Sequence, residues 1–488
     1  MHRRRACVLG LALCAVAPDT DVSAQAQAPA PLPTCRQTLD SLDARLRRNY
    51  AGFLLEVRGA RRDAYDVMVQ RVGRRADTTS LNACYPVLAS YTAWYEDPHV
   101  FVLQSQSVDS TERAQRIASL RHVRVSEADV RADLARRAAS RDPLEGIWYD
   151  GALRVAVVRD PDREAGTFVA VVLQGDSASW PIGAVRAEFR RVRADEYAAR
   201  LFTRAFAEMT LTARIHKRTM LRLSPGIWGR AFPLSPADTG LVDTIDVHRP
   251  RVSVRERSVV VSMPSHDGAH TRRLDHLVAA HAADMAARPL LIIDLRGNEG
   301  GGAMTSRALH PWVASATSRA TPFDSGAAVM LSSPHQVAYA KRFTGTDTSA
   351  FVRSLVARLE ANPGQLVPLE ETPSPSAPDS SRAGNWRVVV MVDRGTVSAA
   401  EVLVLRALRS TRATVVGEPT EGALDYQSVQ VVGLGTGYTR WALGYPTITA
   451  HADLPKRGMR GRGITPEVRI DWSKVADPIA EVERRFAR

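Results

Sequence analysis

The chain has 488 residues, more than one ordinary hydrophobic core supports, so two or three folded units are expected. An apolar content of 45% and a charged content of 24% are those of a globular protein and exclude a disordered one. The net charge is +13, but the basic residues are spread along the chain among acidic ones, without zinc-finger spacing or an aromatic-basic RNA motif. This distribution favours a solvated basic surface over a nucleic-acid partner.

The first residues have the pattern of an export signal. Basic residues at 2–5 lead into twelve apolar residues from Ala6 to Ala17, a run too short to span a bilayer, and small residues follow. We therefore expect a signal peptide over residues 1–26 and a periplasmic or secreted mature protein with no integral membrane span. A Pro- and Ala-rich tether, residues 27–34, comes next.

The cysteines agree with export. Removal of the signal peptide takes away Cys7 and Cys14 and leaves Cys35 and Cys84. In an oxidising compartment such an even pair favours a disulfide, and two unrelated buried thiols are an equally open alternative.

Residues 27–125 are expected to form a helical N-terminal domain. Leu39, Leu42 and Leu46 recur at helical spacing, and a second periodic run follows them. A third helical stretch ends at the segment GluAspProHis, residues 96–99, because proline disfavours a helix at the residue before it.

Residues 140–245 change character and predict a small antiparallel β domain, barrel-like in form. Short β-rich runs separated by turn residues support this, at residues 153–158, 168–173 and 187–192. The region also holds three tryptophans that suit a packed core better than a sugar-binding surface: Trp148, Trp180 and Trp228.

Residues 250–475 alternate strand and helix. The runs 290–295 and 386–392 are continuously apolar, as buried parallel strands are. Helices are expected over 271–287 and 398–409, and a Pro- and Ser-rich loop lies at 371–382. The predicted fold class is therefore a multidomain α/β protein with a helical N-terminal region and a small β domain.

A glycine-rich turn follows the first buried strand. AspLeuArgGlyAsnGluGlyGlyGly, residues 294–302, ends in three glycines that permit unusual backbone angles and a close approach of substrate. Such a loop can direct backbone N–H groups at a developing oxyanion. A phosphate cradle or a plain tight turn would look similar, although neither the dinucleotide nor the P-loop spacing fits.

A serine opens the helix after the second buried strand. Ser398 lies where the positive end of the helix dipole would stabilise negative charge in acyl transfer, with the Ala399 N–H beside it. The pattern Ser398-x-x-Glu401 is also a capping box, which is the structural alternative. The lipase-type Gly-x-Ser-x-Gly elbow is absent, since Thr396 and Ala400 flank the serine.

Four segments of this region, in this order, resemble the signature blocks of tail-specific, S41-type serine peptidases. They are AspLeuArgGlyAsnGluGlyGly (294–301), ThrValSerAlaAlaGlu (396–401), ValGlyGluProThrGluGly (416–422) and GlyIleThrProGlu (463–467). The resemblance implies a crotonase/ClpP-like α/β spiral for a catalytic domain at 250–475. It also implies Ser398 as the nucleophile, with oxyanion donors at Gly300, Gly301 and Ala399.

One departure separates the chain from the Ser–Lys branch of this family. Ala423 stands where that branch carries its lysine, and no lysine lies between residues 342 and 455. The sequence is more similar to the tricorn-like branch, whose base is a histidine in a turn well before the glycine loop. That resemblance makes His99 the candidate general base. Its rivals are histidines expected on exposed helix surfaces: His270, His276 and His281.

The acid that would orient His99 is left open. In the tricorn-like branch a glutamate precedes the last signature block, and the matching place here is near Arg460. The remaining candidates are Glu418, Asp425 and Glu96. No metal site is expected, because the histidines lack an HExxH pattern and the two mature cysteines show no paired spacing.

These features predict a secreted serine peptidase that cleaves a peptide or protein substrate through an acyl-enzyme and needs no cofactor. Two alternatives remain, an inactive relative that binds peptide or lipid and a serine esterase. The β-rich region lacks the carboxylate-binding loop of a PDZ module, so recognition of substrate C-termini is not assumed. Nothing in the sequence predicts an oligomeric state.

Overall fold

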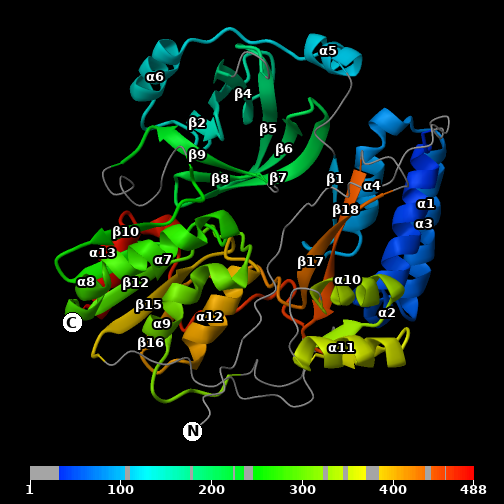
Figure 1. The fold of residues 1–488 in the computed structure, drawn as a ribbon. Coiled ribbons are helices and arrows are strands. Elements are labelled where there is room, and N and C mark those ends of the chain that lie inside the picture. The colour runs from blue at the N-terminus through cyan, green and yellow to red at the C-terminus, as the bar shows by residue number, and fades with distance from the viewer. Residues whose placement is uncertain are drawn as a thin grey trace. The chain divides into compact units, whose positions relative to one another are not determined.

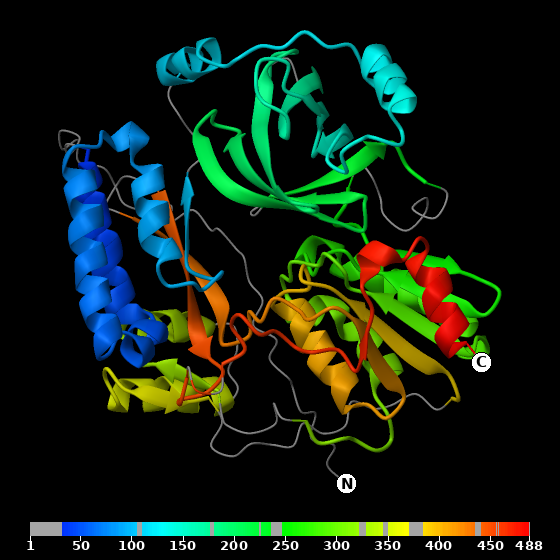
Figure 2. The ribbon, with the colours of Figure 1, turned by 180° about the vertical axis from the view of Figure 1, so that it is seen from behind.

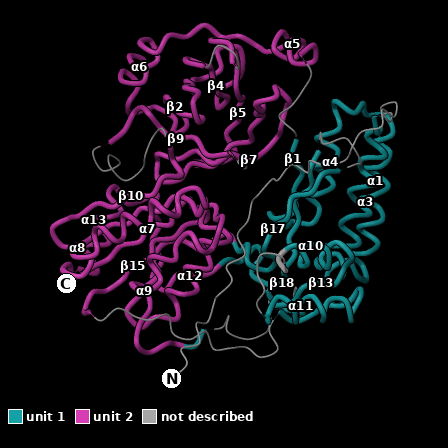
Figure 3. The backbone as a smooth tube through the Cα atoms, in the orientation of Figure 1, with its two compact units in different colours: residues 1–105, 320–377, 422–463 teal, residues 106–319, 378–421, 464–488 magenta. Residues whose placement is uncertain are grey.

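The computed structural model describes residues 32–104, 110–175, 180–223, 226–235, 246–321, 328–344, 350–369, 384–434, 441–454, 456 and 458–487. The predicted signal peptide and the Pro- and Ser-rich loop at 371–382 lie outside the described residues, as does most of the tether. The chain forms two compact units, each assembled from three stretches (Figure 3). Unit 1 comprises residues 1–105, 320–377 and 422–463, and unit 2 comprises 106–319, 378–421 and 464–488.

Unit 1 begins with the helices that the apolar spacing predicts. They are α1 (Cys35–Asn49), α2 (Ala51–Glu56), α3 (Ala60–Asp77) and α4 (Tyr85–Ala93), with the short 3-10 helix η1 (Leu81–Ala83) before α4. Leu39, Leu42 and Leu46 are buried on one side of α1. A capping box between Thr34 and Gln37 fixes the beginning of that helix. A disulfide joins Cys35, the first residue of α1, to Cys84, the residue before α4.

Later parts of the chain supply most of the sheet of unit 1. Its antiparallel strands are β1 (Phe101–Gln104), β13 (Val329–Leu331), β14 (Leu366–Pro368), β17 (Tyr426–Gly433) and β18 (Trp441–Thr449). The helices α10 (Pro334–Thr344) and α11 (Ala350–Ala361) belong to the same unit. Trp441, Leu443 and Tyr445 of β18 join the buried core of the N-terminal helices. The helical N-terminal region therefore shares one hydrophobic core with strands from the second half of the chain.

Unit 2 contains a closed β-barrel with the antiparallel strands expected between residues 140 and 245 (Figure 1). Its strands are β2 (Gly146–Asp150), β3 (Leu153–Arg159), β4 (Thr167–Gln174), β5 (Val185–Arg193), β6 (Glu196–Phe202), β7 (Glu208–His216), β8 (Met220–Arg222) and β9 (Ile227–Phe232). The helices α5 (Ser110–Ala118) and α6 (Glu127–Arg136) precede it. The three tryptophans of this region are buried in the barrel core, which is the packing role favoured by the sequence.

The rest of unit 2 is a sheet with the order β10-β11-β12-β15-β16-β19. The strands are β10 (Arg251–Val254), β11 (Ser258–Ser262), β12 (Leu290–Asp294), β15 (Arg387–Val392), β16 (Ala413–Gly417) and β19 (Val468–Arg469). All pairs from β11 to β19 are parallel, and β10 is an antiparallel edge. The two buried strands predicted from continuous apolar runs are thus the central neighbours β12 and β15. Their carboxyl ends meet at one edge of the sheet.

Helices cover both faces of this sheet (Figure 2). On one face α13 (Pro478–Phe486) buries Ile479 and Val482 against alternate residues of the strands, among them Ile292 and Met391. The other helices are α7 (Thr271–Ala280), α8 (Ala282–Ala287), α9 (His310–Val313) and α12 (Ala399–Arg409), with the 3-10 helices η2 (Gly268–His270), η3 (Ala303–Leu309) and η4 (Trp472–Lys474). The helix predicted over 271–287 is interrupted at His281, where the backbone leaves helical geometry.

The architecture is a mixed α/β fold with several structural parts, as the sequence predicted. The crotonase/ClpP-like spiral and the predicted domain boundaries stay predictions. Within the described ranges, no helix combines the length and the apolar character needed to cross a bilayer.

Candidate active site

Two loops follow the central strands of the unit 2 sheet at its carboxyl edge. The glycine loop, residues 295–302, follows β12, and the serine loop, residues 393–398, follows β15. The Val397 N–H donates to the Asn298 carbonyl at 2.9 Å, and the Thr396 hydroxyl donates to the Leu295 carbonyl at 3.0 Å. The two loops are therefore held together by hydrogen bonds.

Ser398 has a strained backbone at the point where the serine loop enters α12. Its φ is 54° and its ψ is −116°, a combination that residues other than glycine rarely adopt. Such a conformation costs about 1–3 kcal/mol and persists only when its surroundings enforce it. A sharp, strained strand-to-helix turn is also how hydrolytic enzymes expose a nucleophilic serine.

Glu401, in the first turn of α12, holds the N-terminus of this helix in place through hydrogen bonds. Its carboxylate is buried and accepts the Ser398 N–H at 2.8 Å and the Thr420 hydroxyl at 2.6 Å. The Thr420 hydroxyl in turn accepts the Ile464 N–H at 2.8 Å. The predicted capping box between Ser398 and Glu401 therefore forms. The bonds from Glu401 to Thr420 and from Thr420 to Ile464 link the second, third and fourth signature segments of the sequence.

The glycine loop packs directly on the serine turn. A Cβ atom at Gly300 would lie 2.7 Å from the Val397 carbonyl oxygen, 2.9 Å from the Ser398 Cβ and 3.0 Å from the Ala399 nitrogen. Gly300 also has φ of 87°, and Gly301 has φ of 132°. Only glycine fits this approach without displacement of the serine. The structure thus brings together Gly300, Ser398 and Ala399, as predicted from the sequence.

The backbone donors of this site are not equivalent. The Gly300 N–H, one of the predicted oxyanion donors, donates to the Asn298 side-chain oxygen at 2.9 Å. The Gly302 N–H donates to the His266 carbonyl at 2.8 Å. Ala399 lies in the first turn of α12, where backbone N–H groups have no acceptor within the helix. Its N–H is therefore the donor that the helix itself directs outward beside Ser398.

His266 is a residue of this site that the sequence reasoning missed. Its Nδ1 lies 3.1 Å from the Asn298 side-chain oxygen, and its own N–H donates to the Gly300 carbonyl at 2.9 Å. Burial lowers the pKa of His266 to about 4, so the ring is neutral at pH 7. The useful sequence pattern was its position, a few residues after the predicted strand 258–263 and hence at the same edge of the sheet.

The burial of His266 predicts a pH dependence of stability. Its pKa in the folded state, about 4, is lower than the value of about 6.5 in the unfolded chain, so acid favours the unfolded chain. The free energy of unfolding should fall by up to about 3 kcal/mol from this group as pH decreases from 6.5 to 4. Urea titrations across this range on the wild type and on His266→Gln measure it. Parallel pH profiles for the two proteins would contradict the prediction.

His99 lies in unit 1, in a turn between α4 and β1. The Asp97 carboxylate accepts the His99 N–H at 2.9 Å and lies 3.6 Å from the ring Nδ1. It also accepts the Tyr50 hydroxyl at 2.7 Å. Burial raises the pKa of Asp97, against the opposing effect of His99. Asp97 is thus an acid beside the candidate base, although the sequence reasoning considered its neighbour Glu96, which is exposed.

The other candidate acids have different surroundings. In unit 1, the Asp425 carboxylate accepts the N–H groups of Met459 at 2.6 Å and Arg460 at 3.2 Å, so it anchors a backbone turn. Arg460, near the place where the resembling branch carries a glutamate, forms an ion pair with the buried Glu56. In unit 2, burial and the nearby Asp393 raise the pKa of Glu418.

The rival histidines lie at the surface of unit 2, as expected. His270 and His281 are partly exposed beside Asp246 and Asp284, both at 3.3 Å, and His276 is exposed on α7. Within the described ranges, no cluster of three or more His, Cys, Asp or Glu side chains is arranged to hold a metal ion.

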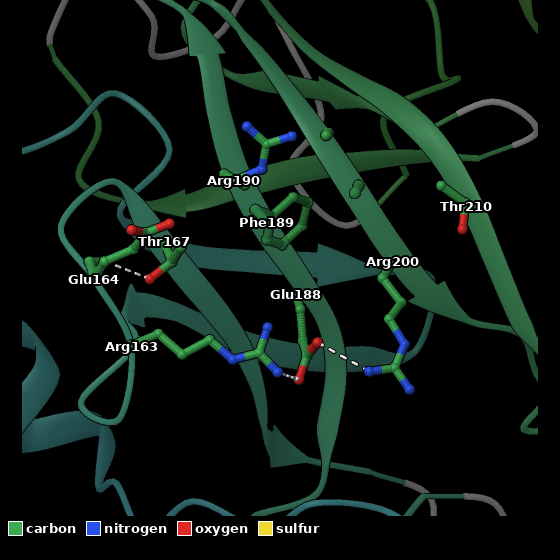
Figure 4. Close-up of a pocket in the computed structure, with 10 residues that line it drawn as sticks. Arg163, Glu164, Thr167, Glu188, Phe189, Arg190, Arg200 and Thr210 are labelled. Atoms are coloured by element: carbon green, nitrogen blue, oxygen red, sulfur yellow. Dashed lines mark hydrogen bonds and ion pairs between the residues drawn. The ribbon is translucent and has the colours of Figure 1, made fainter.

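A separate hollow on the barrel has paired charges and no comparable chemistry (Figure 4). It has a volume of about 540 Å³. The Glu188 carboxylate accepts from Arg163 at 3.2 Å and from Arg200 at 3.1 Å, and Arg190 and Thr210 also line it. The Glu188 carboxylate is neutralised by the two guanidinium groups, and Ser398 remains the candidate centre.

A serine at a strained helix entrance, packed against a glycine loop at the carboxyl edge of a parallel sheet, defines a class of nucleophile site found in α/β hydrolytic enzymes. Residues 259–470 match the model of peptidase family S41. These residues contain all four segments, so the resemblance of the segments to this family is confirmed.

Comparison with solved structures gives likenesses over most of the chain. Mature CPAF is 12% identical, covers 93% of this chain and 98% of its own, and has a TM-score of 0.44. The photosystem II D1 C-terminal processing protease is 13% identical, with 94% and 98% covered and a TM-score of 0.38. A putative peptidase from Parabacteroides merdae is 13% identical, with 92% and 93% covered and a TM-score of 0.39. No curated protein matches the chain in sequence.

Proposed function

We propose that the protein is an exported serine peptidase with Ser398 as its nucleophile. The observation that carries the proposal is the backbone of Ser398, which is held at φ of 54° against Gly300 at the N-terminus of α12. A serine needed only as a cap would adopt the extended conformation typical of that position without strain. The match of residues 259–470 to a peptidase family supports the same chemistry.

In the proposed mechanism Ser398 attacks the carbonyl carbon of a peptide bond. His99 accepts the hydroxyl proton and then gives it to the leaving amine, and Asp97 stabilises the protonated ring. The N–H groups of Ala399 and Gly301 hold the oxyanion, since the Gly300 N–H is engaged with Asn298. Water then attacks the acyl-enzyme with His99 as the base, which releases the acid product and restores Ser398.

Export is part of the proposal. The disulfide between Cys35 and Cys84 supports an oxidising compartment, because such bonds are rare in the reducing cytosol. The predicted signal peptide points the same way. Separation of periplasm from cytoplasm, followed by immunoblotting of the native protein, tests this part; recovery of the full-length protein from the cytoplasm alone would contradict it.

Reaction with a fluorophosphonate probe tests the proposed chemistry directly. We expect covalent labelling of the wild-type protein that disappears in Ser398→Ala. A panel of unstructured protein substrates and small esters then separates the peptidase from an esterase. Absence of labelling and of hydrolysis, with the fold intact by circular dichroism, would instead indicate a binding protein that keeps this fold.

Substitution of Gly300 by alanine tests the close approach at the nucleophile. The new methyl group would lie 2.9 Å from the Ser398 Cβ, and φ of 87° is strained for alanine. We expect kcat/KM to fall by about 10²-fold, since small displacements of reacting groups have effects of this size. Gly268→Ala is the matched control, because its Cβ would meet nothing within 4 Å. Equal activity of the two variants would contradict the prediction.

A further inference from the structure

A hairpin of the barrel reaches the two loops of the candidate site. It consists of β7 (Glu208–His216), β8 (Met220–Arg222) and the turn between them, all within unit 2. Lys217 and Arg218 in this turn have φ of 52° and 60°, a conformation that normally selects glycine or asparagine. Two adjacent residues with positive φ make the tip of this hairpin a tight turn whose conformation the surrounding structure must enforce.

His216, the last residue of β7, inserts its ring between the glycine loop and the serine loop. Its Nδ1 lies 2.8 Å from the Asp393 carboxylate, and only 7% of the residue is exposed. A Cβ atom at Gly395 would lie 2.5 Å from the His216 Cε1, and one at Gly297 would lie 2.9 Å from its Cβ. The His216 side chain therefore occupies space that is available only because residues 297 and 395, one in each loop, are glycines.

Asp393 connects the hairpin to both loops. One carboxylate oxygen accepts the N–H groups of Gly297 and Gly395, both at 2.8 Å, and the other accepts from His216. Burial alone would raise the pKa of Asp393, but His216 and the Gly297 N–H lower it well below its usual value. The ionised carboxylate of Asp393 thus connects the serine loop, to which it belongs, with the glycine loop and the barrel.

Two further contacts from the hairpin reach the end of β12 and the glycine loop that follows it. The buried Lys217 ammonium lies 3.2 Å from the Asp294 carboxylate at the end of β12. Arg222 of β8 forms an ion pair with Glu299 in the glycine loop. Buried ion pairs are poor sources of net stability, because loss of hydration offsets their attraction. Their concentration on the end of β12 and the glycine loop that follows it is better explained by a need for fixed geometry.

We propose that the β7–β8 hairpin is a brace that sets the geometry of the glycine loop and Ser398, with His216 as its principal positioning residue. This inference rests on the proposed peptidase function. His216 does not touch the reacting atoms; it acts through Asp393 on Gly297 and Gly395. The barrel thereby supplies a positioning residue to the candidate site.

The test compares His216→Ala, His216→Asn and Arg218→Ala in the full chain. The asparagine side chain can restore a hydrogen bond to Asp393, and Arg218 is the matched control because it lies in the same turn and its guanidinium donates to the Ala476 carbonyl. We expect the rate constant of fluorophosphonate labelling and kcat to fall about 10²-fold in His216→Ala, with KM nearly unchanged. His216→Asn should recover much of the loss, and Arg218→Ala should label like the wild type.

Amide hydrogen exchange tests the positioning role of the hairpin independently of catalytic activity. The amides of Gly297 and Gly395 should lose protection in His216→Ala and keep it in Arg218→Ala, whether or not the protein hydrolyses peptides. Labelling of the wild type and His216→Ala at equal rates overturns the inference while the peptidase function stands. Failure of the wild type to label overturns the proposed function instead.

Lys217→Met covers the case in which His216→Ala does not fold. It removes the ammonium at similar volume, and labelling about 10-fold slower than in the wild type is expected. Unchanged labelling and unchanged exchange of the glycine-loop amides in this variant would also overturn the brace.

Discussion

Replacement of Ser398 by alanine should abolish hydrolysis, and replacement by glycine should do so while leaving the protein more stable than the alanine variant. Loss of the nucleophile is expected to lower kcat by about 10⁴-fold or more. The two variants differ in the backbone, because glycine adopts φ of 54° without strain and alanine does not. Relief of this strain should make Ser398→Gly about 1 kcal/mol more stable than Ser398→Ala.

Ser126 provides the matched control for this experiment. It caps α6, accepts the Asp129 N–H at 3.1 Å and has an ordinary φ of −102°. Without strain to relieve, Ser126→Gly should not be more stable than Ser126→Ala by the margin expected at Ser398. Urea unfolding of the four variants measures the difference. If Ser398→Gly were no more stable than Ser398→Ala, the idea that strain is stored at the nucleophile would be lost.

Replacement of His99 by alanine should have the second largest effect on activity. A positioned general base contributes about 10²–10⁴-fold to the rate, so kcat/KM should fall by this factor. Asp97→Asn should cause a smaller fall, because the ring keeps its place in the turn but loses the carboxylate 3.6 Å from its Nδ1. Peptide hydrolysis and the rate of fluorophosphonate labelling should fall together in both variants.

The helix histidines of unit 2 are the controls for His99. His276→Ala and His281→Gln remove surface rings from α7 and from its C-terminal cap and should leave both rates unchanged. If either control variant lost as much activity as His99→Ala, the assignment of His99 as the general base would be contradicted. Full activity of His99→Ala itself would exclude it as the base.

The elements around Ser398 could be predicted because their patterns are local. Continuous apolar runs identified β12 and β15, and the strand-turn-helix order identified α12 to within one residue. Parallel strands place their carboxyl ends at one edge of the sheet, which agrees with the proximity of Gly300 and Ser398 that the family resemblance implied. The spiral form of the domain and the role of His99 came from resemblance and remain to be tested by experiment.

The residues missed by sequence reasoning depend on contacts between distant segments. His216 and Asp393 are separated by 177 residues, and no local pattern links a barrel strand to the serine loop. His266 contacts Asn298, 32 residues later, and no local pattern links these two positions either. Asp97 is different, because it lies beside Glu96 in the segment 96–99 and the sequence does not distinguish these two neighbouring carboxylates.

The interleaving of the chain between its two units restricts how the protein can be divided. Strand β19 and helix α13 complete the α/β sheet, yet they follow a stretch of unit 1 in the sequence. Translation from the N-terminus therefore produces the nucleophile long before the last strand that supports it. No contiguous fragment corresponds to either half, so expression of the peptidase-like part alone would require circular permutation or a designed linker across the excised segments.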